Sequence, residues 1–325
     1  MNEQGFYEEG KDILIFDKIS RNARLIAYQN ESGEKLLQKT LIPWYFEKLS
    51  FDQRIEEARK VNKITKYFRE GLMNHSFPVI PKYEFYITEQ GFPVHIMDYV
   101  GDDLAKIIIQ NDESKEAHVI TEKLISAIKG IFWQKEPWIY APDLKVNNFC
   151  FNDQGEIIFV DIYPPYCILP NGEFFVFHPN PTDENLIEEE KKRKFTLLGA
   201  IRRMRFFYLK LTNDYLEETF EKCLYRNLPS HLVSEAMKTI EDLPDKIILN
   251  LKGKRLKHYI LDLPSNEDTI REVAARLIPR SNKSRLELLR QIFGFSSKFA
   301  DSEFIGEREQ RFNKAKELLL KTMNL

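Results

Sequence analysis

The sequence predicts an α+β protein in which a small antiparallel sheet with one helix precedes a larger, mainly helical region. Two observations predict this order. Short apolar runs separated by turn residues fill most of the first hundred residues, and helical spacing of apolar residues takes over after Gly101. We therefore expect two lobes, a smaller sheet-forming one followed by a larger helical one.

Five short segments of the smaller lobe have the composition of strands. They cover residues 12–16, 24–29, 34–42, 82–88 and 94–99. The single helix expected among them follows Ser50-Phe51-Asp52-Gln53, a Ser-x-x-Gln pattern that fits a helix capping box. Apolar residues then recur at steps of three and four, which predicts an amphipathic helix. Gly71 and the region of Pro78 and Pro81 are expected to end it.

The larger lobe is expected to begin with helices over residues 104–109 and 116–133. A strand pair interrupts them, with NFCFN at residues 148–152, a turn at Asp153-Gln154-Gly155, and EIIFVD at residues 156–161. A second hairpin is expected in PYCILPNGEFFVFH, where Asn171-Gly172 is a strong turn signal. From about residue 184 the pattern is mainly helical.

Composition excludes several classes of function. The 325 residues include 48 basic and 50 acidic side chains, so no global positive field favours nucleic acid. The first residues are polar and acidic, unlike a secretory signal, and no apolar run approaches the length of a membrane span. The three cysteines lack CxxC spacing, which favours buried, reduced thiols in a cytoplasmic protein.

Two aspartates flank the first hairpin. Asp143 stands in APDLKVNN, with Asn148 five residues later, and Asp161 follows Asn148 by thirteen residues across the strand pair. Each residue taken singly is an ordinary turn residue. Together they supply the oxygen ligands that Mg²⁺ prefers and a further carboxylate for proton transfer, so we interpret the set as functional.

This spacing resembles the catalytic loop and second metal-binding aspartate of the protein-kinase-like superfamily, which includes protein kinases and the aminoglycoside and choline phosphotransferases. The resemblance covers residues 12–210. It implies a two-lobed kinase-like fold that uses ATP and Mg²⁺, with the smaller lobe over residues 1–97 and the larger lobe over residues 98–325. By resemblance, Asp143 is the base, Lys145 contacts the transferred phosphoryl group, and Asn148 and Asp161 are the metal ligands.

The family also implies a nucleotide clamp in the smaller lobe. Lys39 falls where the family has a strand lysine, and Glu57 lies on the apolar side of the predicted helix, where it would pair with that lysine. Lys35 is a weaker rival for Lys39, and the alternative that Lys39 and Glu57 are unrelated surface residues stays open. The hinge between the lobes would bind adenine through the backbone of residues Asp98, Tyr99 and Val100.

Three departures from the family pattern narrow the function. The stretch DKISRNARLIAY has no glycine where the family has a phosphate-binding loop, and Ala141-Pro142 replaces the His-Arg before the catalytic aspartate. Asp161-Ile162-Tyr163 is followed by two prolines, which predict a stiff, extended exit in place of a flexible switch. These departures argue against an ordinary regulated protein kinase.

The expected function is therefore transfer of the γ-phosphoryl group of ATP to a hydroxyl, with a small molecule favoured over a protein as acceptor. Two alternatives stay open. The first is an atypical protein kinase, because Asp143-Leu144-Lys145 matches the pattern of Ser/Thr protein kinases. The second is a catalytically weak pseudokinase that acts as a binding scaffold, which the missing glycine loop favours.

One predicted helix carries a basic cluster. In KFTLLGAIRRMRFFYLK, residues 194–210, the basic residues Arg202, Arg203 and Arg205 lie among aromatic residues, as on a membrane or nucleic-acid surface. The apolar residues of the stretch follow helical spacing, so we favour a core helix with one basic edge.

Overall fold

A computed structural model represents the chain. It describes residues 6–19, 23–42, 46, 48–110, 114–163, 165–176, 188, 191–211, 214–278, 288–289, 291–292 and 305–325. Residues 20–22, in the stretch that lacks the glycine of the family's phosphate-binding loop, lie outside these ranges. The described part confirms the α+β class: a five-stranded antiparallel sheet with a helix is followed by a mainly helical region.

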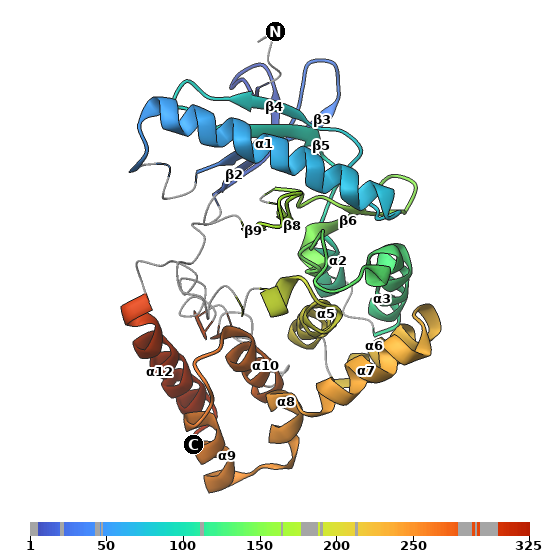
Figure 1. Ribbon diagram of the computed structural model, residues 1–325, viewed down its shortest axis with the longest axis vertical. Coiled ribbons are helices and arrows are strands. Elements are labelled where there is room, and N and C mark those ends of the chain that lie inside the picture. The colour runs from blue at the N-terminus through green and yellow to red at the C-terminus, as the bar shows by residue number, and fades with distance from the viewer. Residues whose placement is uncertain are drawn as a thin grey trace. The chain divides into compact units, whose positions relative to one another are not determined.

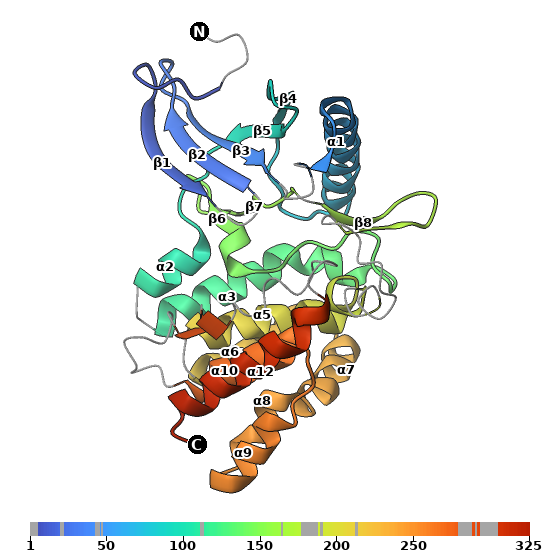
Figure 2. The ribbon, with the colours of Figure 1, turned by 90° about the vertical axis from the view of Figure 1, so that its left-hand side faces the viewer.

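The sheet contains the five strands that the sequence predicts. They are β1 (Ile13–Ile19), β2 (Ala23–Gln29), β3 (Lys35–Leu41), β4 (Glu84–Ile87) and β5 (Pro93–Asp98). Their spatial order is β1-β2-β3-β5-β4, and every neighbouring pair is antiparallel. The first three strands follow one another across the sheet, as Figure 2 shows.

Helix α1 (Phe51–Asn74) begins at the predicted capping box and packs against β4 and β5 (Figure 1). The Ser50 side chain accepts a hydrogen bond from the Gln53 amide, and the Gln53 side chain accepts one from the Ser50 amide. The expected end at Gly71 and the region of Pro78 and Pro81 is confirmed in part, because the helix continues past Gly71 to Asn74 and ends before Pro78. Gly71 lies inside the helix. A Cβ at this position would fall 2.1 Å from the Tyr140 ring, so only glycine leaves room for that ring.

Both predicted hairpins are confirmed. The first pairs β6 (Phe149–Phe151) with β7 (Ile157–Phe159), and its turn is closed by the Asn152 amide, which donates to the Glu156 carbonyl. The second pairs β8 (Tyr166–Ile168) with β9 (Phe174–Val176) around Asn171-Gly172, where Gly172 has φ of 84°. That backbone conformation is in the left-handed region, which favours glycine.

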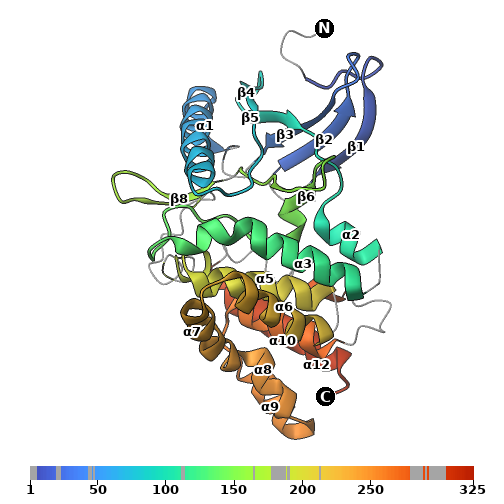
Figure 3. The same ribbon diagram turned by 90° about the vertical axis from the view of Figure 1, so that its right-hand side faces the viewer.

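The helical region contains the elements α2 (Leu104–Gln110), α3 (Ser114–Ile128), η2 (Lys129–Trp133), η3 (Val146–Asn148), α5 (Leu197–Leu211), α6 (Asp214–Asn227), α7 (Ser230–Glu241), α8 (Pro244–Ile247), η4 (Ile248–Asn250), α9 (Gly253–Leu261), α10 (Glu267–Leu277) and α12 (Ile305–Thr322). Helix α6 packs against both α3 and α5, and Figure 3 shows these three helices of unit 2. An apolar core is shared by α5, α9, α10 and α12. No helix in the described ranges is long and apolar enough to cross a bilayer.

The chain forms two compact units. Unit 1 consists of residues 1–103, 140–142 and 148–177, and unit 2 of residues 104–139, 143–147 and 178–325. The sheet, α1 and both hairpins thus belong to unit 1, and the helices from α2 onward belong to unit 2. The division at residues 97 and 98 expected from the kinase-like resemblance stays a prediction.

Candidate functional site

The first hairpin brings two of the predicted residues to one end of unit 1. Cross-strand pairing of β6 and β7 continues past the strands, since the Val160 amide donates to the Asn148 carbonyl at 2.9 Å. Asp161 directly follows Val160, so Asn148 and Asp161 flank the open end of the hairpin. The spacing of thirteen residues is the length needed for two short strands and their turn.

Lys39 joins this end of the hairpin to the sheet. Its Nζ lies 2.5 Å from Asp161 Oδ1 and also donates to the backbone carbonyl of Tyr163. The side chains of Lys39 and Asp161 are 13% and 28% exposed, so the pair is partly screened by water. Lys35, the rival on the same strand, is exposed.

A buried histidine lies beside this ion pair. His95 is directly opposite Lys39 in the β3–β5 register. Its ring contacts those of Tyr163 and Tyr83 in tilted arrangements, at centroid distances of 4.1 and 4.4 Å. Burial, assisted by the charge of Lys39, lowers the pKa of His95 to about 3, so the imidazole is neutral at physiological pH. Sequence reasoning missed this residue because only the strand register reveals its position.

The structure does not bring Lys39 and Glu57 together. The carboxylate of Glu57 lies 3.9 Å from Lys60 Nζ on the same helix, whereas Lys39 contacts Asp161. Among the three expected hinge residues, Tyr99 already uses its backbone amide, which donates to the Lys35 carbonyl where the β3–β5 ladder ends. Of its neighbours in the expected hinge, Asp98 is the last residue of β5 and Val100 follows the ladder.

In unit 2, the carboxylate of Asp143 is buried between two cations. Its Oδ1 lies 2.7 Å from Arg203 Nη1, and its Oδ2 lies 2.6 Å from Lys145 Nζ. Burial by itself would raise the pKa of Asp143, but Arg203 and then Lys145 outweigh burial and hold that pKa below its ordinary value. Asp143 is therefore a carboxylate, and an acceptor of hydrogen bonds, at neutral pH.

All three arginines of the basic cluster on α5 form internal ion pairs. Arg202 pairs with Glu272 of α10 at 2.5 Å, Arg203 with Asp143, and Arg205 with Asp245 of α8 at 2.7 Å. Arg276 also lies 3.3 Å from Asp245. The basic edge therefore faces acids of unit 2, and the interpretation of this helix as a core element is confirmed. The spacing of residues in the sequence did not reveal that Arg203 contacts Asp143.

Asp161 and Asn148 supply one carboxylate and one amide oxygen, a hard-oxygen set that suits Mg²⁺. A tighter centre of three or more His, Cys, Asp or Glu side chains is not found among the described residues. The three cysteines are buried, as their composition and spacing predict. Comparison of the chain with protein-family models and with curated proteins yields no match.

Proposed function

We propose that this protein is a kinase-like phosphotransferase that uses ATP and Mg²⁺ to phosphorylate a hydroxyl, with a small molecule favoured as acceptor. One observation carries the proposal. Lys39 and Asp161 are 122 residues apart in the chain, yet their side chains form an ion pair at 2.5 Å. By family resemblance, both residues are expected to bind the same phosphate groups, Lys39 directly as a cation and Asp161 through a metal ion that it holds.

The proposed role of Asp143 follows from its charge and its partners. Because its pKa is held below the ordinary value, the carboxylate accepts a hydrogen bond from the acceptor hydroxyl and orients it. Arg203 fixes one oxygen at 2.7 Å, and Lys145 lies 2.6 Å from the other, where the family places a cation on the transferred group. When bound, Mg²⁺ would neutralise phosphate charge, and Asn148 and Asp161 would hold it.

The test is ATP consumption in the presence of Mg²⁺ by the full chain and two matched variants. Asp161→Ala removes the proposed metal ligand, whereas Asp153→Ala removes an exposed aspartate in the turn of the same hairpin. We expect a loss of about a hundredfold or more for the first variant and parental activity for the second. Absence of ATP binding and turnover at millimolar nucleotide, or equal losses in both variants, would overturn the proposal.

A second test compares two lysines of β3. Lys39→Met removes the cation beside Asp161, and Lys35→Met removes an exposed lysine four residues away. We expect only the first change to weaken nucleotide binding. Equal effects of the two changes would show that nucleotide does not use Lys39.

A binding scaffold without turnover is the second candidate. It is favoured by Glu57, which contacts Lys60 and leaves Lys39 without the helix partner that active members of the superfamily use. ATP binding without consumption, unaffected by any added hydroxyl compound, would identify this case. Phosphate transfer to the chain itself or to a generic protein would instead favour the atypical protein kinase.

A further inference from the structure

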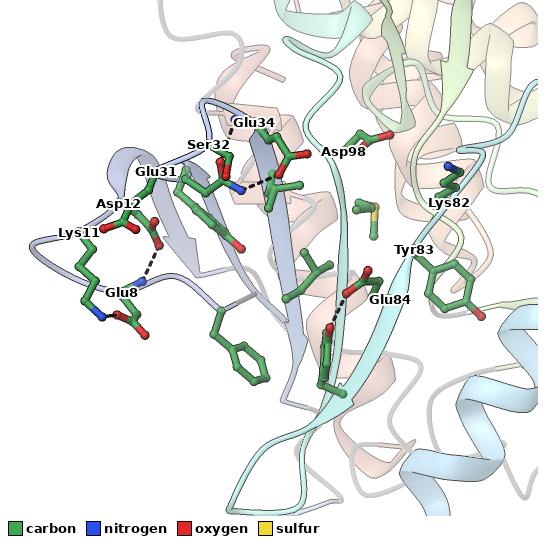
Figure 4. A pocket seen from close by; sticks show the side chains of 17 residues that line it. Glu8, Lys11, Asp12, Glu31, Ser32, Glu34, Lys82, Tyr83, Glu84 and Asp98 are labelled. Atoms are coloured by element: carbon green, nitrogen blue, oxygen red, sulfur yellow. Dashed lines mark hydrogen bonds and ion pairs between the residues drawn. The ribbon is translucent and has the colours of Figure 1, made fainter. Parts of the chain in front are cut away.

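Unit 1 contains a pocket of about 730 Å³ on its sheet (Figure 4). Its walls come from the N-terminal segment, the β2–β3 turn and the strands β2, β3, β4 and β5. The volume lies within the range of about 300–1,000 Å³ that small-molecule sites occupy. The pocket is therefore large enough for an organic ligand.

This pocket lies on the sheet face opposite Lys39. Side chains alternate between the two faces of a strand, so Leu36, three residues before Lys39, points to the other face. Leu36 pairs with Tyr28, and Ile96, next to His95, pairs with Glu84. Tyr28, Leu36, Glu84 and Ile96 all line the pocket. A ligand held by these four residues lies on the face away from Lys39, although the pocket shares Asp98 with the expected hinge.

The walls carry a large excess of negative charge. Lys11 and Lys82 are the lining cations, against six lining carboxylates: Glu8, Asp12, Glu31, Glu34, Glu84 and Asp98. The formal sum is two minus six, or −4. Among the described residues Glu8 pairs with Lys11, and the other five carboxylates have no ion pair with a cation. A concave wall with one sign of charge concentrates ligands of the opposite sign.

Aromatic rings form the second component of the pocket. Tyr28 is only 1% exposed and contacts the Tyr7 ring, so it supports the wall and offers little surface of its own. Phe6 and Tyr86 meet at a centroid distance of 5.2 Å, and the Tyr86 hydroxyl donates to Glu84. Aromatic faces beside carboxylates attract organic ammonium groups through the ring quadrupole and supply apolar contact for methylene groups.

We propose that this pocket binds an aliphatic polyamine, a flexible chain of methylene groups that carries two or more ammonium groups. The carboxylates come from separate places, Asp12 in the N-terminal segment, Glu31 and Glu34 at the β2–β3 turn, and Glu84 and Asp98 on β4 and β5 (Figure 4). Such spacing suits several separated charges. A single metal ion requires converging ligands, and no group of three acids in the described ranges converges in that way.

The experiment is calorimetric titration of the full chain with spermidine at about 0.15 M salt, where weak surface attraction is screened. The double variant Glu84→Gln, Asp98→Asn removes two charges from the pocket. The control variant Glu56→Gln, Glu70→Gln removes two exposed charges from α1 outside the pocket. We expect saturable binding of one spermidine, about tenfold or more weaker in the first variant and within about twofold of the parent in the control.

A second readout uses the unaltered protein, so it does not depend on how the variants fold. Spermidine is expected to slow amide hydrogen exchange in residues 6–12 and 30–36, which border the pocket. Absence of saturable binding, equal weakening in both double variants, or protection confined to other segments would overturn the proposal. Binding of a trilysine peptide in place of spermidine would overturn it as well, since the occupant would then be a basic peptide.

Discussion

Replacing Arg203 by methionine removes a cation that contacts the buried carboxylate of Asp143. Breaking a buried ion pair by removal of one partner costs about 3–5 kcal/mol, because the remaining charge is left without compensation. Lys145 still lies 2.6 Å from the carboxylate, so we expect the lower end, about 3 kcal/mol of unfolding free energy at pH 7. The loss should be local to unit 2, which contains all three residues.

The pH dependence of this loss has a defined sign. Asp143 has a folded-state pKa below its ordinary value, so its contribution to stability is present above the unfolded-state pKa and is lost as pH falls through the folded-state pKa. Arg203→Met raises the folded-state pKa and removes much of that contribution. The difference in unfolding free energy between the parent and the variant should therefore shrink as the solution becomes acidic.

A double-mutant cycle of Arg203→Met with Asp143→Asn, measured by urea unfolding with tryptophan fluorescence, isolates the pair. We expect a coupling free energy of about 2 kcal/mol or more. The control cycle is Arg226→Met with Glu122→Gln, an ion pair at 3.5 Å whose side chains are 58% and 41% exposed, where about 0.5 kcal/mol or less is expected. Equal coupling in the two cycles, or a constant difference across acidic pH, would refute the reasoning.

Two further substitutions probe each unit separately. Asp245→Asn leaves the two buried arginines Arg205 and Arg276 without their carboxylate and should lower the unfolding free energy, measured in urea, by about 4 kcal/mol. Glu218→Gln, the same change of acid to amide at an exposed residue, should lower it by less than about 0.5 kcal/mol. Similar losses in the two variants would contradict the buried pairing. Gly71→Ala places a Cβ 2.1 Å from the Tyr140 ring and should lower the unfolding free energy by about 1–3 kcal/mol. The further change Tyr140→Ala should recover part of this loss. An unchanged midpoint of unfolding in Gly71→Ala would show that the two residues do not touch.

Much of the fold could be predicted because its signals are local. The capping box joins Ser50 to Gln53 within one helical turn, and Asn171-Gly172 defines a hairpin turn with two residues. The continuation of helix α1 past Gly71 is a point that such local signals do not predict. Glycine inside a helix usually lowers the confidence of a helix prediction, and only the distant Tyr140 ring explains why it is tolerated there.

The candidate site was predictable only as a set of residues. The spacing of Asn148 and Asp161 follows from the hairpin between them, and the β-strand pattern placed Lys39 on the third strand. The partners of these residues were not predictable. Lys39 contacts Asp161 in place of Glu57, and Arg203 contacts Asp143 from a helix about sixty residues later in the chain.

The sequence by itself determined the strands, the first helix, both hairpins and the residue types available for phosphate chemistry, because each depends on neighbours a few positions apart. Only the tertiary structure decided which charges are paired, that His95 is neutral beside Lys39, and that one face of the sheet forms an acidic, aromatic pocket. The physical reason is that pairing and burial depend on strand register and helix packing, which join residues far apart in the chain.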